Sequence, residues 1–209
     1  MKLYWAPHSR SFVALWMLEE TGAPYEREMV DIRAGAQSTP EYKAINPMAK
    51  VPTLVDDGTA ISETAAICAY LADRAPEAKL APPIGDLARG PYFKWLFFGP
   101  GCVEPAYMEK ATGWQVESGA AGWGGYDRVI DVLDQALEKG PWILGDQFTA
   151  ADVVIGSQLV YGVRMFGLVE SRPSFEAYLQ RCEARPAFQR CLAIDAEGAK
   201  SVSPPPAAA

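Results

Sequence analysis

The sequence predicts a two-part chain, in which an α/β domain precedes an all-helical domain. Strand and helix patterns alternate in the first third, in the order β-α-β, a loop, then β-β-α. A proline-rich stretch follows, and after it the hydrophobic periodicity is helical throughout. We therefore expect a first domain at residues 1–75, a linker at 76–86, a helical domain at 87–200 and a flexible tail at 201–209.

The first domain is expected to contain a small mixed sheet. A strand at residues 2–5 precedes a helix that ends before Gly22, and a second strand follows at 25–30. A β-α-β unit of this kind has parallel strands. Asp57-Gly58 indicates a tight hairpin turn, because glycine accepts the positive φ that such a turn requires. The hairpin should add an antiparallel edge to the sheet.

The segment between Lys50 and the next helix has features of an anion-binding site. Pro52 begins a strand, where it cannot donate to the sheet, and this leaves the backbone of Lys50 and Val51 free for a ligand. A helix expected at 63–74, with Ser62 as its N-cap, adds free N–H groups and partial positive charge. The segment is therefore a candidate carboxylate site, although an ordinary hairpin followed by a helix explains the same spacing.

The centre of the second domain is expected to be a helix that is apolar on nearly every side. Thr149 and Asp152 match a capping box at its start, with Asp in place of the usual Glu. A Gly-Pro-Gly sequence at 99–101 should disturb the first long helix of this domain. Helices are expected at residues 87–112, 126–139, 149–163, 174–185 and 186–196.

Composition excludes several classes of protein. The net charge of −7 disfavours binding to nucleic acid or to anionic membranes. Four widely spaced cysteines without a CxxC pair argue against a disulfide framework or a zinc site, and they fit a reducing compartment. The N-terminus lacks the apolar core of a signal peptide, and the most apolar stretch, Val153–Val163, is too short to span a bilayer. We expect a cytoplasmic protein that binds no metal, membrane or nucleic acid.

Several motifs occur together in a characteristic order. They are Lys-Val-Pro-Thr-Leu at 50–54, Ser-Glu-Thr-Ala-Ala-Ile at 62–67, Gly-Asp-Gln-Phe-Thr-Ala-Ala-Asp at 145–152 and the helical stretch 15–26. With this order and spacing the chain resembles the cytosolic glutathione S-transferases, in particular bacterial members of the serine type. The resemblance covers essentially the whole chain up to the tail. It implies a thioredoxin-like N-terminal domain followed by a helical bundle domain.

The resemblance also implies a glutathione-binding site. Pro52 should follow a cis peptide bond, with the Val51 backbone pairing with the cysteinyl backbone of glutathione. Glu63 should face the γ-glutamyl ammonium group, and Thr64 with the helix start should face the γ-glutamyl carboxylate. Lys50 should lie near the glycyl carboxylate. The alternative for Glu63 is a first-turn glutamate that only complements the helix dipole.

The segment before the first helix is the candidate for thiol activation. A hydroxyl donor and the helix N-terminus would together favour the thiolate of glutathione. Ser9 matches the serine-type members best, and Ser11 is the second choice; an N-cap role is the alternative for either. Arg10 either lends positive charge or is a solvated helix-start arginine, and His8 is expected to be a surface loop residue. The absence of cysteine here argues against the cysteine-type members.

The resemblance implies that glutathione is a co-substrate whose thiolate is conjugated to electrophilic apolar small molecules, a detoxification reaction. The acceptor should bind between the domains, where Phe98, Tyr107 and Met108 are candidates, although most aromatic residues at helical spacing belong to the core. A homodimer is expected. Two other functions stay open: a glutathione-dependent isomerase, and a non-catalytic module for ligand binding or partner docking on the same fold.

Overall fold

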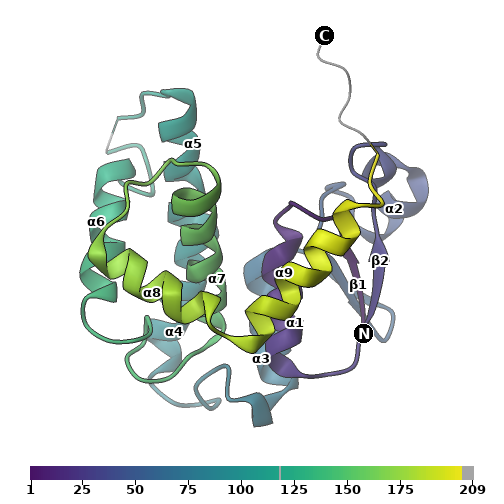
Figure 1. Ribbon diagram of the computed structural model, residues 1–209, viewed down its shortest axis with the longest axis horizontal. Helices are drawn as coiled ribbons and strands as arrows, with labels where there is room; N and C mark the ends of the chain where they lie inside the picture. The colour runs from purple at the N-terminus through teal and green to yellow at the C-terminus, as the bar shows by residue number, and fades with distance from the viewer. Residues whose placement is uncertain (118, 204–209) are drawn as a thin grey trace. The chain divides into compact units, whose positions relative to one another are not determined.

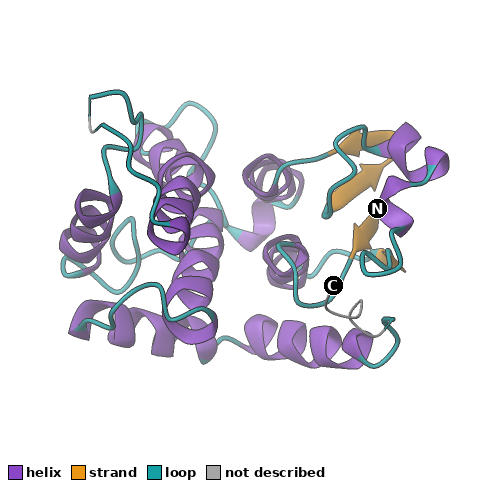
Figure 2. Cartoon of the chain, turned by 90° about the horizontal axis from the view of Figure 1, so that it is seen from above, coloured by secondary structure: helices purple, strands orange, loops and turns teal. Residues whose placement is uncertain are grey.

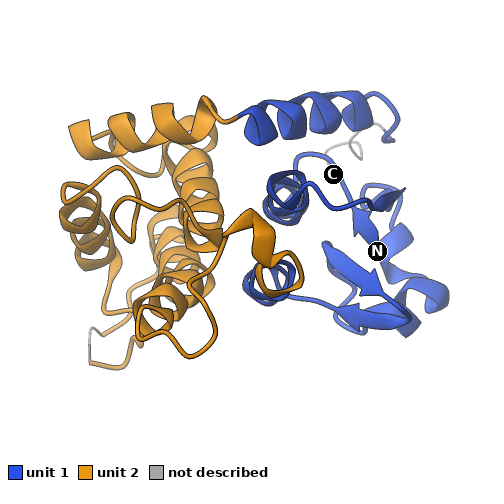
Figure 3. Ribbon diagram, turned by 90° about the horizontal axis from the view of Figure 1, so that it is seen from below, with its two compact units in different colours: residues 1–71, 186–209 blue, residues 72–185 orange. Residues whose placement is uncertain are grey.

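The computed structural model describes residues 1–117 and 119–203, and the chain divides into two compact units (Figure 3). The first unit combines residues 1–71 with 186–209, and the second contains residues 72–185. The last helix, α9 (Pro186–Ala199), therefore groups with the first unit, whereas the sequence suggested a helical domain that extends to residue 200. Of the predicted tail, residues 204–209 lie outside the described part of the chain.

A four-stranded mixed sheet is the framework of the first unit. The strand order is β2-β1-β3-β4, with β1 and β2 parallel and the other two pairs antiparallel. This confirms the predicted parallel pair and hairpin, and Figure 2 shows helices on both sides of the strands. The second strand is shorter than the expected 25–30; its side chains are largely exposed, and it forms one edge of the sheet. The strands are β1 (Lys2–Trp5), β2 (Glu26–Met29), β3 (Thr53–Asp56) and β4 (Thr59–Ile61).

The helices of this unit follow the apolar pattern of the sequence. Leu15, Trp16 and Leu18 of the first helix are fully buried, because that helix is covered on nearly every side. It ends at Gly22, whose φ of 66° closes the helix as predicted. The helical segments up to this point of the chain are α1 (Ser11–Thr21), the 3-10 turn η1 (Ala36–Ser38), α2 (Pro40–Ile45), α3 (Thr64–Arg74) and the 3-10 turn η2 (Pro76–Ala78). The end of α3 and all of η2 belong to the second unit.

Helix α9 packs along α1 (Figure 1). The Phe188 ring meets the ring of Phe12 edge-on at 5.3 Å and that of Trp16 at 4.9 Å, measured between centroids. At Gly198 a Cβ atom would lie 2.5 Å from the Trp5 indole, so only glycine permits this close approach of α9 to the end of β1. Aromatic packing and this glycine fix α9 on the first unit.

The second unit is helical, and its first long helix is interrupted as predicted. A π-helical turn, η3 (Gly99–Val103), separates α4 from α5. Pro100 supplies no backbone N–H there, and a Cβ at Gly99 would lie 2.5 Å from Val154 Cγ1. The glycine therefore allows close packing against the central helix. The helical segments are α4 (Arg89–Phe98), η3, α5 (Glu104–Thr112), α6 (Tyr126–Leu137), α7 (Ala150–Leu159), the π-helical η4 (Val160–Met165) and α8 (Pro173–Glu183).

Helix α7 is buried along its whole length, and the capping box at its start is present as predicted. One carboxylate oxygen of Asp152 accepts from the Thr149 backbone N–H at 2.8 Å, and the other accepts from Ile143 N–H at 2.8 Å and Tyr178 O–H at 2.9 Å. Burial nevertheless raises the pKa of Asp152 to about 6. Because its partners hold the chain around α7, the motif is a folding element of this unit.

Within residues 1–117 and 119–203, no helix combines the length and apolar character needed to cross a membrane. The same described residues contain no group of His, Cys, Asp and Glu side chains that could hold a metal ion. All four cysteines are free thiols.

Candidate active site

The strand register brings three loops to the same edge of the sheet. β1 ends at Trp5, and its residue Tyr4 pairs with Thr53, the first residue of β3. β4 ends at Ile61, which pairs with Leu54 near the same end of β3. The loop after β1, the loop before β3 and the loop after β4 therefore emerge side by side. These segments are residues 6–10, 50–52 and 62–64.

The Val51–Pro52 peptide bond is cis, as predicted. The preceding carbonyl, that of Lys50, accepts hydrogen bonds from the Tyr42 hydroxyl at 2.7 Å and from Asn46 Nδ2 at 2.9 Å. Asn46 is 2% exposed, and its Nδ2 also donates to Thr53 Oγ1 at 3.0 Å. A buried amide thus holds both ends of this loop.

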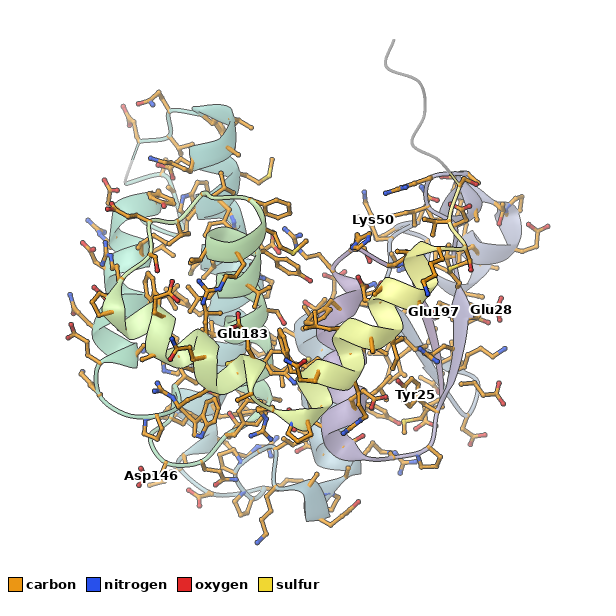
Figure 4. All side chains as sticks on the ribbon, in the orientation of Figure 1. Tyr25, Glu28, Lys50, Asp146, Glu183 and Glu197 are labelled. Carbon is orange, nitrogen blue, oxygen red and sulfur yellow. The ribbon has the colours of Figure 1, made fainter. Side chains whose placement is uncertain are left out.

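The backbone N–H and carbonyl of Val51 are available to bind a ligand. Across the described residues no hydrogen bond engages its N–H or carbonyl. The Lys50 side chain is exposed, and Figure 4 shows it at the surface of the first unit. The loop can therefore offer backbone groups to an extended peptide and a cation to one end of it.

The start of α3 differs from the prediction. The sequence pointed to Ser62 as N-cap, but the helix begins at Thr64, and Ile67 N–H donates to the Glu63 carbonyl at 2.9 Å. Glu63 precedes the helix with a φ of 69°, a left-handed conformation that costs a non-glycine residue about 1–3 kcal/mol. Its side chain is exposed. A strained, exposed glutamate directly before a helix N-terminus suits a ligand that carries both an ammonium and a carboxylate group.

Two serine hydroxyls lie where α1 begins. Ser11 is the first helical residue and is fully buried, and its Oγ accepts from Ala6 N–H at 3.1 Å. Ser9 is half-buried, with its Oγ 2.7 Å from the Ala6 carbonyl and 2.9 Å from Ser11 Oγ. Ser9 Oγ also accepts from Ser11 N–H at 3.1 Å. Arg10 occupies the cap position and is half-buried.

His8 has a partner that the sequence did not reveal. Its backbone N–H is 3.1 and 3.2 Å from the two carboxylate oxygens of Asp195, and its ring Nδ1 is 3.2 Å from Oδ2. The expected surface loop residue is thus tied to α9, although its ring stays exposed. Asp195 lies 187 residues further along the chain, and no local pattern links the two positions. Desolvation raises the pKa of Asp195, and the hydrogen bond from His8 opposes this shift.

The three acceptor candidates lie in the helical unit, in different surroundings. Tyr107 is 3% exposed and donates its hydroxyl to the Gln158 carbonyl at 3.0 Å, which places it in the packed interior. Phe98 is half-buried and meets the Trp95 ring edge-on at 5.2 Å. Met108 is 55% exposed. A role in acceptor binding stays a prediction for all three.

Two protein-family models match parts of the chain. Residues 1–73 match the N-terminal domain of glutathione S-transferase, and residues 116–181 match its C-terminal domain. The chain belongs to the glutathione S-transferase family. This confirms the predicted family and its fold, a thioredoxin-like domain followed by a helical one.

Known glutathione S-transferases resemble the chain over nearly its full length. Glutathione S-transferase GstA of Escherichia coli O157:H7 is 28% identical, over 96% of this chain and 100% of the relative. The disulfide-bond oxidoreductase YfcG of Escherichia coli K12 is 26% identical, over 91% of this chain and 93% of the relative. The family resemblance therefore includes a protein with a different named activity.

Solved structures of glutathione S-transferases have the same fold as this chain. A ternary complex of BphK, a bacterial glutathione S-transferase, matches with a TM-score of 0.79 and 28% identity, over 94% of this chain and 100% of that one. A sphingomonad glutathione S-transferase complexed with glutathione matches with a TM-score of 0.78 and 27% identity, over 94% and 99% of the two chains.

Proposed function

We propose that this glutathione S-transferase conjugates the glutathione thiolate to electrophilic apolar small molecules. The observation that carries the proposal is the meeting of three loops at one edge of the sheet, each with a different group to offer. The loop before β3 offers the free backbone of Val51. The loop after β4 offers the strained Glu63 at the start of α3, and the loop after β1 offers the half-buried Ser9 at the start of α1. An extended tripeptide with two charged ends and a central thiol fits this combination.

Each loop contacts a different part of glutathione in this proposal. Glu63 faces the γ-glutamyl ammonium, and Thr64 with the N-terminus of α3 faces the γ-glutamyl carboxylate. The Val51 backbone, whose N–H and carbonyl have no hydrogen bond within the described residues, pairs with the cysteinyl backbone. The Lys50 ammonium lies near the glycyl carboxylate. The thiol then points toward the N-terminus of α1.

Ser9 is the proposed donor to the thiolate. A free cysteine thiol has a pKa of about 8.5, so glutathione is mostly protonated at neutral pH unless its anion is stabilised. Ser9 Oγ accepts from Ser11 N–H, which leaves its single proton for an acceptor. When glutathione is bound, that proton turns from Ala6 O or Ser11 Oγ to the sulfur. The α1 N-terminus and the neighbouring Arg10 add positive potential.

The chemistry that follows is nucleophilic substitution. The thiolate sulfur uses a lone pair to form a bond to the electrophilic carbon, and the leaving group departs with the electrons of its own bond. Proton loss from the thiol precedes this step, so the rate at neutral pH depends on the thiol pKa in the complex.

Immobilised glutathione and a chlorinated nitroarene test the proposal. We expect retention on the matrix and release of chloride with formation of the thioether. If the protein shows no retention and no turnover, the proposed enzyme function is overturned. Retention with no turnover on a broad panel of electrophiles would favour a binding module instead.

Two related activities are separated by their products. An isomerase would convert its substrate without consuming glutathione. A disulfide oxidoreductase would couple reduction of a disulfide to formation of glutathione disulfide. The first 67 residues contain no cysteine, so exchange chemistry at this site would have to use glutathione itself.

We also propose that the enzyme works in the cytoplasm as a homodimer. Free cysteines support a reducing compartment. An exposed aromatic side chain on α4 supports self-association, since Phe97 is 53% exposed and stacks on the half-buried Phe93 at 6.2 Å. Sedimentation at micromolar concentration tests the assembly, and a monomer would contradict it.

A further inference from the structure

The carboxylate of Asp195 on α9 holds the residue next to Ser9. It accepts the His8 backbone N–H through both oxygens, at 3.1 and 3.2 Å, and it lies 3.2 Å from the ring Nδ1 of the same residue. His8 has a φ of 53°, a left-handed conformation that is unfavourable for residues other than glycine. One side chain thus contacts both the backbone and the ring of a strained residue.

Asp195 is itself firmly placed. It is 8% exposed, and its helix is held along α1 by several independent contacts. The Arg190 guanidinium donates to the Glu19 carboxylate at 2.7 Å and to the Glu19 backbone carbonyl at 2.9 Å. Cys191 Sγ lies 3.7 Å from the Phe12 carbonyl. The carboxylate is therefore a fixed point against which the loop after β1 can be aligned.

We propose that Asp195 is a positioning residue for thiol activation, because it holds the His8 turn that aims the Ser9 hydroxyl. This inference rests on the proposed function. Within the turn, Ser9 Oγ donates to Ala6 O, and Phe12 N–H donates to the Ser9 carbonyl at 3.2 Å. These bonds join neighbours to one another, whereas Asp195 ties the turn to a helix 187 residues further along the chain. Without it, the strain at His8 favours a different path of the chain into α1.

The charge of Asp195 and its positioning role shift the thiol pKa in opposite directions, which makes the inference testable. A buried negative charge close to the thiol would by itself disfavour the thiolate and raise the thiol pKa. Removal of a charge with only that effect would lower the thiol pKa. Removal of a positioning group would raise it, because the Ser9 hydrogen bond to the sulfur is lost.

The test compares Asp195→Ala with the conservative Asp195→Asn in the full-length protein. We expect the alanine variant to lose kcat by about ten- to a hundredfold, as a displaced catalytic group does, with the KM for glutathione changed about twofold or less. The bound thiol, titrated by its ultraviolet absorbance, should show a raised pKa. Asparagine keeps an oxygen that accepts the His8 N–H, so it should retain most of the activity. Glu197→Ala, on the same helix but exposed (Figure 4), is the matched control and should behave as wild type.

A double-mutant cycle with Ser9→Ala separates positioning from general stabilisation. If Asp195 acts through Ser9, adding Asp195→Ala to Ser9→Ala should reduce kcat about twofold or less, although each change alone has a large effect. Fully multiplicative losses would overturn the inference. So would an unchanged or lowered thiol pKa in Asp195→Ala. If the alanine variant does not fold, Asp195→Ser serves in the same cycle, because its shorter hydroxyl cannot span both contacts.

The two proposals fail in different ways. Wild-type protein that neither binds nor turns over glutathione overturns the proposed function, and this inference with it. Wild-type activity with a fully active Asp195→Ala variant overturns the inference alone.

Discussion

The Ser9 and Ser11 hydroxyl oxygens lie 2.9 Å apart, yet their surroundings differ sharply. Ser11 is fully buried, and its Oγ is the acceptor for the backbone N–H of Ala6. Ser9 is half-buried and can turn its proton outward without leaving a buried donor unsatisfied. The two serines, of which the sequence favoured Ser9, therefore differ in burial.

Ser9→Ala should impair chemistry and spare binding. Loss of a hydrogen bond to a charged sulfur costs about 1.5–3 kcal/mol, which corresponds to a rise of roughly one to two units in the pKa of the bound thiol. Turnover at neutral pH should then fall about ten- to a hundredfold. Affinity for glutathione should change little, because Glu63, Thr64 and the Val51 backbone carry the binding. Ultraviolet titration of the thiolate in the binary complex measures the shift.

Ser11→Ala should reduce the stability of the protein more than it impairs the chemistry. It leaves the buried Ala6 N–H without its acceptor, at a cost of about 1–3 kcal/mol in the free energy of unfolding. The thiol pKa should move less than in Ser9→Ala. A larger pKa rise in the Ser11 variant would transfer the catalytic role to Ser11. Lost stability with an unchanged thiol pKa in Ser9→Ala would make Ser9 a plain N-cap.

Glu63→Gly should stabilise the protein and weaken glutathione binding. Glycine adopts the left-handed φ of 69° freely, so relief of strain should add about 1 kcal/mol to the free energy of unfolding. Loss of the carboxylate should weaken glutathione about tenfold, which is about 1.4 kcal/mol. Urea denaturation and calorimetric titration measure the two effects.

Lys79→Gly is the matched control for strain, since Lys79 is exposed and has a φ of 53° in the other unit. It should gain stability without any change in affinity. Equal glutathione affinity in Glu63→Gly and wild type would restrict Glu63 to the helix dipole alternative.

Asn46→Ala should affect both stability and binding. It removes the Nδ2 donor shared by the Lys50 carbonyl and Thr53 Oγ1, with an expected loss of about 1–3 kcal/mol in stability. The loop before Pro52 loses a support, so glutathione affinity should also fall, by about tenfold. Glu41→Ala, an exposed change on α2, should leave both quantities unchanged. Unaltered affinity in a destabilised Asn46 variant would limit the residue to folding.

Asp152 should make stability depend on pH. Burial raises its pKa from 3.8 to about 6, so the native state holds this proton more tightly than the unfolded chain does. The resulting contribution to stability is fully present below pH 3.8 and is lost as the pH rises through about 6.

Asp152→Asn, which does not titrate, provides the reference. The free energy of unfolding of wild type minus that of the variant should fall by up to about 3 kcal/mol across this window, from about two pKa units. A difference that rises with pH would mean that the hydrogen bonds to the ionised carboxylate outweigh its burial.

Features that local chemistry controls could be predicted from the amino-acid sequence. Asp57-Gly58 specifies a hairpin because its backbone requires a positive φ, and Gly22 ends α1 for the same reason. Thr149 and Asp152 form their capping box within four consecutive residues. The family motif around Pro52 correctly indicated a cis bond.

Features that depend on contacts between residues far apart in the chain became visible only in the folded structure. No local sequence pattern indicates that α9 packs on α1 or that Asp195 holds His8, because both outcomes depend on which apolar faces and polar groups meet after folding. The left-handed backbone at Glu63 is also set by its neighbours, since nothing in its own chemistry favours that conformation. Local propensity fixes turns and caps, whereas tertiary packing determines that Ser11 is fully buried and Ser9 only half-buried.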